Sequence, residues 1–453
     1  MRVLLISTYE LGRQPFGLAS PAAWLARAGA EVELLDLACQ PLDESKVREA
    51  DAIAFHLPMH TATRLALAAL GGIRRLNPNA HLAFYGLYAP INEALLRRLG
   101  AELVLGGEFE AGLTSWINRL ERGGAHQEPN RAVELGRQQF IVPERSRLPG
   151  LSRYARLVMP DGSERIVGAT EASRGCKHRC RHCPIVPVYN GIFRIIQPAV
   201  VLADIRQQIR AGAEHITLGD PDFFNGIRHA IGIVTALHEE FPGLTYDVTI
   251  KIEHLLKHSS HLRTLAETGC LFVTSAVESV NDEVLRRLEK GHTRADFLSA
   301  AKLCREAGLI LSPTFVAFTP WTKVEGYIEL LRTIARLGLI ENVAPIQLAI
   351  RLLIPAGSRL LELADARGWI GPFDEDALAY PWANPDSRAD ELCAEIQAVV
   401  LERGKSRASR RAIFTAVWQA AHRAANAEPP PLAEVRDLVS RAAIPYLTEP
   451  WYC

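Results

Sequence analysis

The chain has 453 residues, 48% of them hydrophobic and 23% charged, which is typical of a folded globular protein of two or three domains. Its 51 Lys and Arg balance 51 Asp and Glu, so charge gives no reason to expect nucleic acid or a membrane surface as a partner. No apolar run approaches the ~20 residues of a membrane span or the length of a secretory signal, and eight cysteines are too few for a disulfide framework in a chain of this length; we therefore expect a cytoplasmic protein.

The first 120 residues alternate between strand and helix signals. Strand signals occur at 3–7, 31–36, 52–55, 82–85 and 103–105, and helical patterns occur near 21–28, 62–75 and 93–99. This alternation predicts parallel βαβ units and a doubly wound, Rossmann-like domain over residues 1–120. Ligands of such sheets bind at the carboxyl ends of the strands.

A linker and a second alternating series follow. Residues 121–160 lose the rhythm and are rich in glycine and proline, which indicates a linker. Strand signals then recur at 165–169, 215–218, 246–250, 271–276, 310–318 and 346–353, separated by helical patterns that include one at 255–268. Six βα repeats predict a partial (β/α)6 barrel over 161–360, followed by a helical C-terminal region over 361–453. The fold class is therefore α/β.

The loop after the first barrel strand carries the sequence Cys176-Lys177-His178-Arg179-Cys180-Arg181-His182-Cys183. Three thiolates within eight residues can converge on one soft metal centre. A structural zinc site or a self-contained iron–sulfur cluster takes four ligands, whereas three ligands on a four-iron cube leave one iron open. The alternative is a zinc site completed by His178 or His182.

The Cys-x3-Cys-x2-Cys motif on a first barrel loop resembles that of the radical S-adenosylmethionine (SAM) superfamily. The resemblance implies that Cys176, Cys180 and Cys183 hold a [4Fe–4S] cluster whose open iron binds SAM. Reduction by a donor such as flavodoxin or ferredoxin then cleaves SAM to methionine and a 5′-deoxyadenosyl radical. His182 stands where the family often has an aromatic residue.

The same resemblance suggests residues that contact SAM. Gly219, Asp220 and Pro221 follow the second barrel strand, where the family approaches the methionine amino group. Glu278 and Ser279 follow the fourth strand and would contact the ribose hydroxyls, and Gln347 would lie near the adenine. The alternatives are a plain Gly-Asp-Pro turn and a helix cap at Glu278-Ser279. No catalytic side chain is predicted.

The N-terminal domain resembles the cobalamin-binding domain that precedes the barrel in many radical SAM proteins. Gly107-Glu108-Phe109-Glu110 is close to a Gly-Glu-x-Glu segment of that domain. An Asp-x-His-x-x-Gly motif, which would supply a histidine to cobalt, is absent from the sequence. His56 and His60 are therefore not expected to ligate cobalt, and whether cobalamin is bound stays open.

The end of the sequence, Thr448-Glu449-Pro450-Trp451-Tyr452-Cys453, resembles the tail of the CUAEP/CCAEP radical SAM group. Those tails continue as Cys-Cys-Ala-Glu-Pro or Cys-selenocysteine-Ala-Glu-Pro. The resemblance implies a selenoprotein truncated at a misread UGA codon, whereas the alternative is a terminus that ends in an incidental cysteine. A thiol–selenol pair would be a strong soft ligand.

Three functions follow from these features. The first is a radical SAM enzyme acting on an unidentified small molecule, with cobalamin where it is bound. The second is a cobalamin-independent radical transfer to a substrate or a soft element such as arsenic, held by a Cys/selenocysteine tail. The third is a non-catalytic zinc or iron–sulfur protein.

Overall fold

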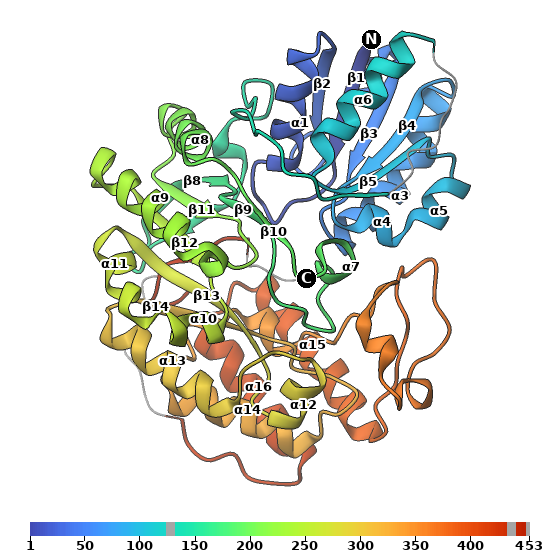
Figure 1. The fold of residues 1–453 in the computed structure, drawn as a ribbon. Helices are drawn as coiled ribbons and strands as arrows, with labels where there is room; N and C mark the ends of the chain where they lie inside the picture. Colours follow the sequence, from blue (N-terminus) through green and yellow to red (C-terminus); the bar gives the residue numbers. More distant parts are fainter. Residues whose placement is uncertain (124–131, 433–440, 450–453) are drawn as a thin grey trace.

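The computed structural model describes residues 1–123, 132–432 and 441–449. Two sheets dominate the molecule, the first at the upper right of Figure 1 and the second at its left. The first has the strand order β2-β1-β3-β4-β5-β6, and the second has the order β14-β13-β12-β11-β8-β7-β15. The α/β fold class is confirmed, with a parallel sheet followed by a curled half-barrel sheet.

The N-terminal sheet is parallel throughout. Its strands are β1 (Arg2–Ser7), β2 (Glu31–Asp36), β3 (Ala52–His56), β4 (His81–Tyr85), β5 (Leu103–Gly107) and β6 (Val133–Glu134). Its helices are α1 (Phe16–Arg27), α2 (Glu44–Glu49), α3 (His60–Leu76), α4 (Tyr88–Ile91), α5 (Glu93–Arg98) and α6 (Phe109–Glu121). Strand order reverses at β1, which lies between β2 and β3, so a ligand crevice is expected at the ends of β1 and β3.

Helices cover both faces of this sheet. Side chains of α1 and α6, such as Leu25 and Trp116, form one buried cluster with one face. Side chains of α3, such as Leu70 and Ile73, form a second cluster with the other face. The central strands are therefore buried on both sides, which explains their continuous apolar runs.

The second sheet is a run of parallel strands with an antiparallel edge. The parallel strands are β8 (Glu164–Thr170), β11 (His215–Leu218), β12 (Thr245–Thr249), β13 (Cys270–Glu278) and β14 (Ile310–Phe315). At the other edge β7 (Arg156–Val158) pairs antiparallel with β8 and with β15 (Tyr446–Leu447). A separate hairpin joins β9 (Ser173–Gly175) to β10 (Phe193–Ile195).

Helices pack on the outer face of this half-barrel (Figure 1). They are α8 (Pro198–Arg210), α9 (Ile227–Glu240), α10 (Ile252–Lys257), α11 (Leu262–Glu267), α13 (Arg294–Glu306) and α14 (Val324–Arg336), with short α7 (Val186–Tyr189) and α12 (Asp282–Arg287) on loops. The C-terminal helices α15 (Ser387–Lys405) and α16 (Arg410–Ala424) join the same core. No helix of the described ranges is both long and apolar enough to cross a membrane.

Two expected elements differ. Residues 346–353 are not a strand: a 3-10 turn, η4 (Pro345–Leu348), is followed by a single parallel bridge between Phe318 and Arg351. The reason is that the Gln347 side chain accepts the backbone N–H of Phe315 at 3.0 Å, a hydrogen bond that a sixth strand would otherwise make to β14. The helix expected at 255–268 is divided into α10, a 3-10 turn and α11.

Candidate functional site

A cavity of about 400 Å³ lies where the carboxyl ends of the two sheets face each other. The loops after β1, β3, β4 and β5 line one side of it, and the loops of the half-barrel line the other. Its volume is within the range of small-molecule sites, roughly 300–1,000 Å³. The carboxyl ends of the parallel strands, where ligands usually bind, therefore face the same cavity from both sheets.

The three cysteines of the motif lie on the half-barrel side of this cavity. Cys176, Cys180 and Cys183 all line it, and their thiols are free. Burial raises the pKa of Cys183, and the neighbouring thiols of Cys180 and Cys176 raise it further. The structure thus brings the three sulfurs close enough to influence one another's ionisation.

Gly175 sets the entry of the cysteine loop. Its φ is +73°, and a Cβ at this position would lie 2.4 Å from Tyr189 Cδ1 and 2.5 Å from the carbonyl oxygen of Ile192. Glycine alone tolerates both the left-handed conformation and the close approach. The antiparallel pairing of β9 and β10 closes the base of the loop.

Two buried lysines lie beside the sulfurs. Lys251 Nζ is 3.8 Å from Cys180 Sγ, and Lys290 Nζ is 3.2 Å from Glu278 Oε1. Burial alone would lower the pKa of Lys290, but the charges of Glu278 and Cys180 raise it above its ordinary value. These cations offset the negative charge of thiolates, and the sequence analysis gave neither lysine a role.

The two histidines of the motif face carboxylates. His182 Nε2 is 3.0 Å from Glu278 Oε1. His178 has Nε2 3.5 Å from Asp222 Oδ2 and Nδ1 3.4 Å from Glu253 Oε2. A zinc site that used either imidazole with the three thiols would have to replace these contacts.

Gly219, Asp220 and Pro221 follow β11 and line the cavity. The Asp220 carboxylate accepts the backbone N–H of Ala172 at 2.9 Å and the hydroxyl of Ser173. Burial raises the pKa of Asp220 to about 7, against these hydrogen bonds. Asp220 therefore fixes the strand that leads into the cysteine loop.

Glu278 and Ser279 end β13 in different environments. Glu278 lines the cavity with φ of +65°, and although burial opposes ionisation, Lys290 and His182 lower the pKa of Glu278 to about 2. Ser279 Oγ accepts the N–H of Asn281, the N-cap of α12, so this side chain serves the turn and is not among the residues that line the cavity. Gln347 lines the cavity.

His56 and His60 line the N-terminal side of the cavity. The His56 ring packs against Tyr85 and Phe109, with centroids 5.2 and 5.9 Å away, and a Cβ on Gly17 would lie 1.9 Å from its Cε1. His60 Nε2 is 2.7 Å from the carbonyl oxygen of Ala377. His56 is thus held as a core side chain at the end of β3.

Arg174, two residues before Cys176, connects the two halves. Its guanidinium donates to both Glu110 carboxylate oxygens, at 2.6 and 3.0 Å, and to Glu171 at 2.8 Å. It also lies over the ring of Phe109 at 4.8 Å and that of Phe140 at 5.1 Å. The Gly-Glu-x-Glu segment therefore contacts the cysteine loop directly, which the sequence analysis did not predict.

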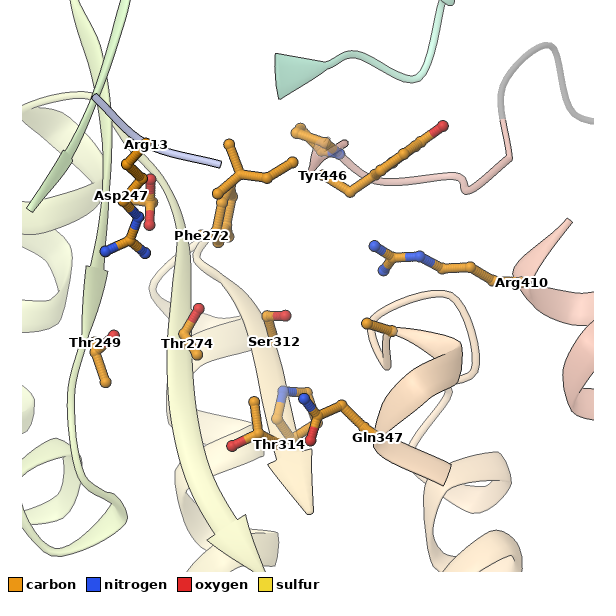
Figure 2. Close-up of a pocket in the computed structure, with 14 residues that line it drawn as sticks. Arg13, Asp247, Thr249, Phe272, Thr274, Ser312, Thr314, Gln347, Arg410 and Tyr446 are labelled. Atoms are coloured by element: carbon orange, nitrogen blue, oxygen red, sulfur yellow. The ribbon is translucent and has the colours of Figure 1, made fainter. Parts of the chain in front are cut away.

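A smaller cavity of about 50 Å³ lies deeper in the half-barrel and shares Arg13, Thr249, Thr314 and Gln347 with the large one. Figure 2 shows strand hydroxyls pointing into it, with Arg410 and Tyr446 on one side and Arg13 beside Asp247 on the other. Burial lowers the pKa of Arg410 to about 10. Hydroxyl and charged groups therefore line part of this inner cavity.

Comparison with protein families matches residues 170–334 to the radical SAM superfamily. The chain is 23% identical over 333 residues to a hopanoid C-3 methylase of Methylococcus capsulatus, an alignment that covers 71% of this chain and 64% of the relative. It is 21% identical over 301 residues to a putative methylthiotransferase of Methanocaldococcus jannaschii, covering 62% and 63%. The alignments thus span less than two thirds of these relatives.

Two solved structures share the fold. The cobalamin-dependent SAM radical enzyme OxsB, with aqua-cobalamin bound, superposes with a TM-score of 0.66 at 16% identity, covering 87% of this chain and 66% of OxsB. The radical SAM methyltransferase TsrM of Kitasatospora setae, with cobalamin and a [4Fe–4S] cluster, superposes with a TM-score of 0.61 at 18% identity, covering 74% and 70%. The likeness to OxsB extends into the N-terminal sheet as well as the half-barrel, because it covers 87% of this chain.

Proposed function

We propose that this chain, which belongs to the radical SAM superfamily through residues 170–334, is an enzyme that binds a [4Fe–4S] cluster and SAM in the cavity between its two halves. The observation that carries the proposal is the group of three free cysteines, Cys176, Cys180 and Cys183, on one loop in a ligand-sized cavity. When bound, the cluster supplies an electron that cleaves SAM. The donor would be a small electron carrier such as flavodoxin or ferredoxin, and the setting the reducing cytoplasm.

The side chains present fit such a cluster. The three thiols would supply three ligands, while His178 and His182 face carboxylates and would leave one iron open. Lys251 and Lys290 offset the charge of the thiolates. Asp220 and Gly175 fix the loop from its base.

We assign the SAM contacts to the residues that line the cavity around the sulfurs. The backbone carbonyls of Gly219, Asp220 and Pro221 would accept hydrogen bonds from the methionine ammonium group. The ionised Glu278, held by Lys290 and His182, would accept hydrogen bonds from the ribose hydroxyls, and Gln347 would lie near the adenine. Ser279 would act only through the turn that positions Glu278.

The N-terminal side of the cavity would hold cobalamin as a second cofactor, which supplies a methyl group when bound. The loops after β1, β3, β4 and β5 leave an open edge there, and Gly86 and Gly107, both with positive φ, line it without side chains. His56 is enclosed by aromatic rings and would support this surface rather than ligate cobalt.

A second candidate is radical transfer to a substrate held by the C-terminal tail, without cobalamin. It is favoured by the hydrogen bond between the Tyr9 hydroxyl and Glu449, because Tyr9 adjoins Glu10 and Leu11 in the loop that lines the cavity. The described chain therefore runs up to the rim of the cavity. Cys453, on which the selenoprotein hypothesis depends, lies outside the described residues.

The test is anaerobic reconstitution with iron and sulfide, followed by incubation with SAM and dithionite. We expect about four irons per chain and formation of 5′-deoxyadenosine by mass spectrometry; each of Cys176→Ala, Cys180→Ala and Cys183→Ala should abolish both. Cys304→Ala, at a fully buried cysteine in the core, is the matched control and should retain them. A wild-type protein without an iron–sulfur centre would refute the proposal.

A further measurement distinguishes the two candidates. Cobalamin that co-purifies with the protein, together with S-adenosylhomocysteine as a product, would support the first candidate over the second.

A further inference from the structure

We propose that His178, Asp222 and His254 form a second metal site, separate from the three cysteines, for a divalent transition ion such as zinc. The three side chains come from different segments of the half-barrel. His178 lies in the cysteine loop, Asp222 in the loop after β11, and His254 on α10 after β12. One ligand atom from each residue lies within 4.8 Å of the other two.

The distances fit ligands around one ion. Asp222 Oδ2 is 3.5 Å from His178 Nε2 and 2.6 Å from His254 Nδ1. Atoms that each bind zinc at ~2.0–2.2 Å in tetrahedral geometry lie roughly 3.3–3.5 Å apart. The His178–Asp222 pair already has this spacing, and the Asp222–His254 pair would reach it through a side-chain rotation that separates the two atoms. The two imidazole rings are packed edge to face, with centroids 4.8 Å apart.

The same three atoms have no hydrogen bond. His178 Nε2, Asp222 Oδ2 and His254 Nδ1 are each buried and make no hydrogen bond in the described part of the chain, so Asp222 Oδ2 meets the two rings only in ion-pair contacts. Asp222 is 0% and His254 6% exposed. Buried polar atoms without hydrogen bonds are costly, and an ion bound between these three would give each of them a coordination bond.

A second layer of contacts fixes the ligand atoms. His178 Nδ1 lies 3.4 Å from Glu253 Oε2, the carboxylate–histidine arrangement that orients metal-binding imidazoles. Asp222 Oδ1 accepts the N–H of Phe224 at 3.3 Å, which leaves Oδ2 for the ion. Two imidazoles and one carboxylate are a donor set that suits zinc and ferrous iron, with the remaining position available to water.

An ion at this site would hold the cysteine loop in place. It would join the loop to the segments after β11 and β12, and Lys251 would extend the connection from Glu253, 3.7 Å away, to Cys180, 3.8 Å away. None of the three side chains that would bind the ion is a proposed ligand of the cluster. The metal would therefore be structural and would bind whether or not the cluster is present.

The test uses the full chain with Cys176, Cys180 and Cys183 all changed to alanine, so that thiolates and cluster are removed. Zinc binding is measured by calorimetry and elemental analysis, and thermal unfolding is followed with and without zinc. We expect one zinc per chain, a zinc-dependent rise in the unfolding temperature, and X-ray absorption showing only nitrogen and oxygen ligands.

Added substitutions make the test specific. Asp222→Asn and His254→Gln should abolish the zinc stoichiometry and the zinc-dependent rise, and Glu253→Gln should weaken binding about tenfold to a hundredfold. His258→Gln, at the neighbouring histidine whose ring lies 5.6 Å from His254, is the matched control and should bind zinc as before. No zinc on the triple-alanine chain, or binding unaffected by Asp222→Asn, would overturn the proposal. Because the cluster is absent throughout, failure of the proposed enzyme activity leaves this result intact.

Discussion

Glu108 and Glu110 both contact Arg174, but their pKa values are shifted in opposite directions. Glu110 accepts hydrogen bonds from Arg174, Ser20 and Gln138, and these outweigh burial, so the pKa of Glu110 is lowered. Glu108 lies 3.6 Å from Arg174, and burial dominates, which raises the pKa of Glu108 to about 7. The same arginine therefore contacts one carboxylate with a lowered pKa, Glu110, and one whose pKa is raised to about 7, Glu108.

Glu108→Gln should remove a pH-dependent loss of stability. Because the folded pKa of Glu108 lies above its ordinary value of 4.5, folding binds a proton between about pH 4.5 and 7, and the free energy of unfolding falls as pH rises through that window. The shift corresponds to roughly 3 kcal/mol. Denaturant unfolding at pH 5 and pH 8 should therefore show a smaller decline in Glu108→Gln than in the wild type.

The control for this prediction is Glu110→Gln. The lowered pKa of Glu110 stabilises the fold above about pH 4.5, and this contribution is lost as pH falls through the folded pKa, so Glu110→Gln should cost most stability at pH 8. Parallel pH profiles for the wild type and Glu108→Gln would contradict the assignment.

At the residue scale, local spacing was enough to place the three cysteines on one loop but not to predict the residues that surround them. Cys176, Cys180 and Cys183 lie within eight residues, so the loop itself gathers them. Arg174 meets Glu110 across 64 positions, and Lys251 meets Cys180 across 71. Contacts of that separation depend on the packing of two sheets, which no local pattern encodes.

At the element scale, buried strands were the most predictable features. The runs 3–7 and 52–55 lie within β1 and β3, because the side chains of these strands are buried against both faces of the sheet and are almost all apolar. Residues 346–353 are equally apolar, but a side chain, Gln347, replaces the backbone pairing of a strand. Apolar composition predicts burial there, and only the tertiary contact decides the backbone conformation.

Helix α1 depends on a glycine at its first turn. Gly17 gives space to the His56 ring, and a Cβ would lie 1.9–2.3 Å from three of its atoms. Gly17→Ala should therefore destabilise the protein by roughly 2–3 kcal/mol through overpacking, despite the better helix propensity of alanine. Thermal or denaturant unfolding measures the change.

The comparison for Gly17 is Gly232→Ala in α9. A Cβ at Gly232 meets nothing within 4 Å, so alanine should stabilise the helix by about 0.5–1 kcal/mol. If both substitutions shifted stability in the same direction, the enclosed position of His56 would not be the controlling feature.

At the scale of the whole molecule, buried polar contacts join the two halves. Arg174 pairs with Glu110 across the junction, and Arg145 binds Asp204 as well as Gln14. The Tyr154 hydroxyl donates to Asp36 at 2.9 Å. Phe16 of α1 belongs to the core of the half-barrel. These contacts make each half part of the environment of the other.

The two sheets should therefore unfold together. Hydrogen exchange in increasing denaturant should give the same midpoint for β3 and β4 as for β11 and β12, because opening one half leaves buried charges of the other half without their partners.

Glu110→Ala leaves the buried guanidinium of Arg174 without its main partner, which costs about 3–5 kcal/mol. This loss of stability weakens the junction between the two halves. The midpoint of β3 and β4 should then move below that of β11 and β12. Glu240→Ala removes a half-exposed ion pair with Arg206 inside one half and should leave the midpoints coincident. Separate midpoints in the wild-type protein would mean that the halves are stable alone and that the cavity between them can open without unfolding either.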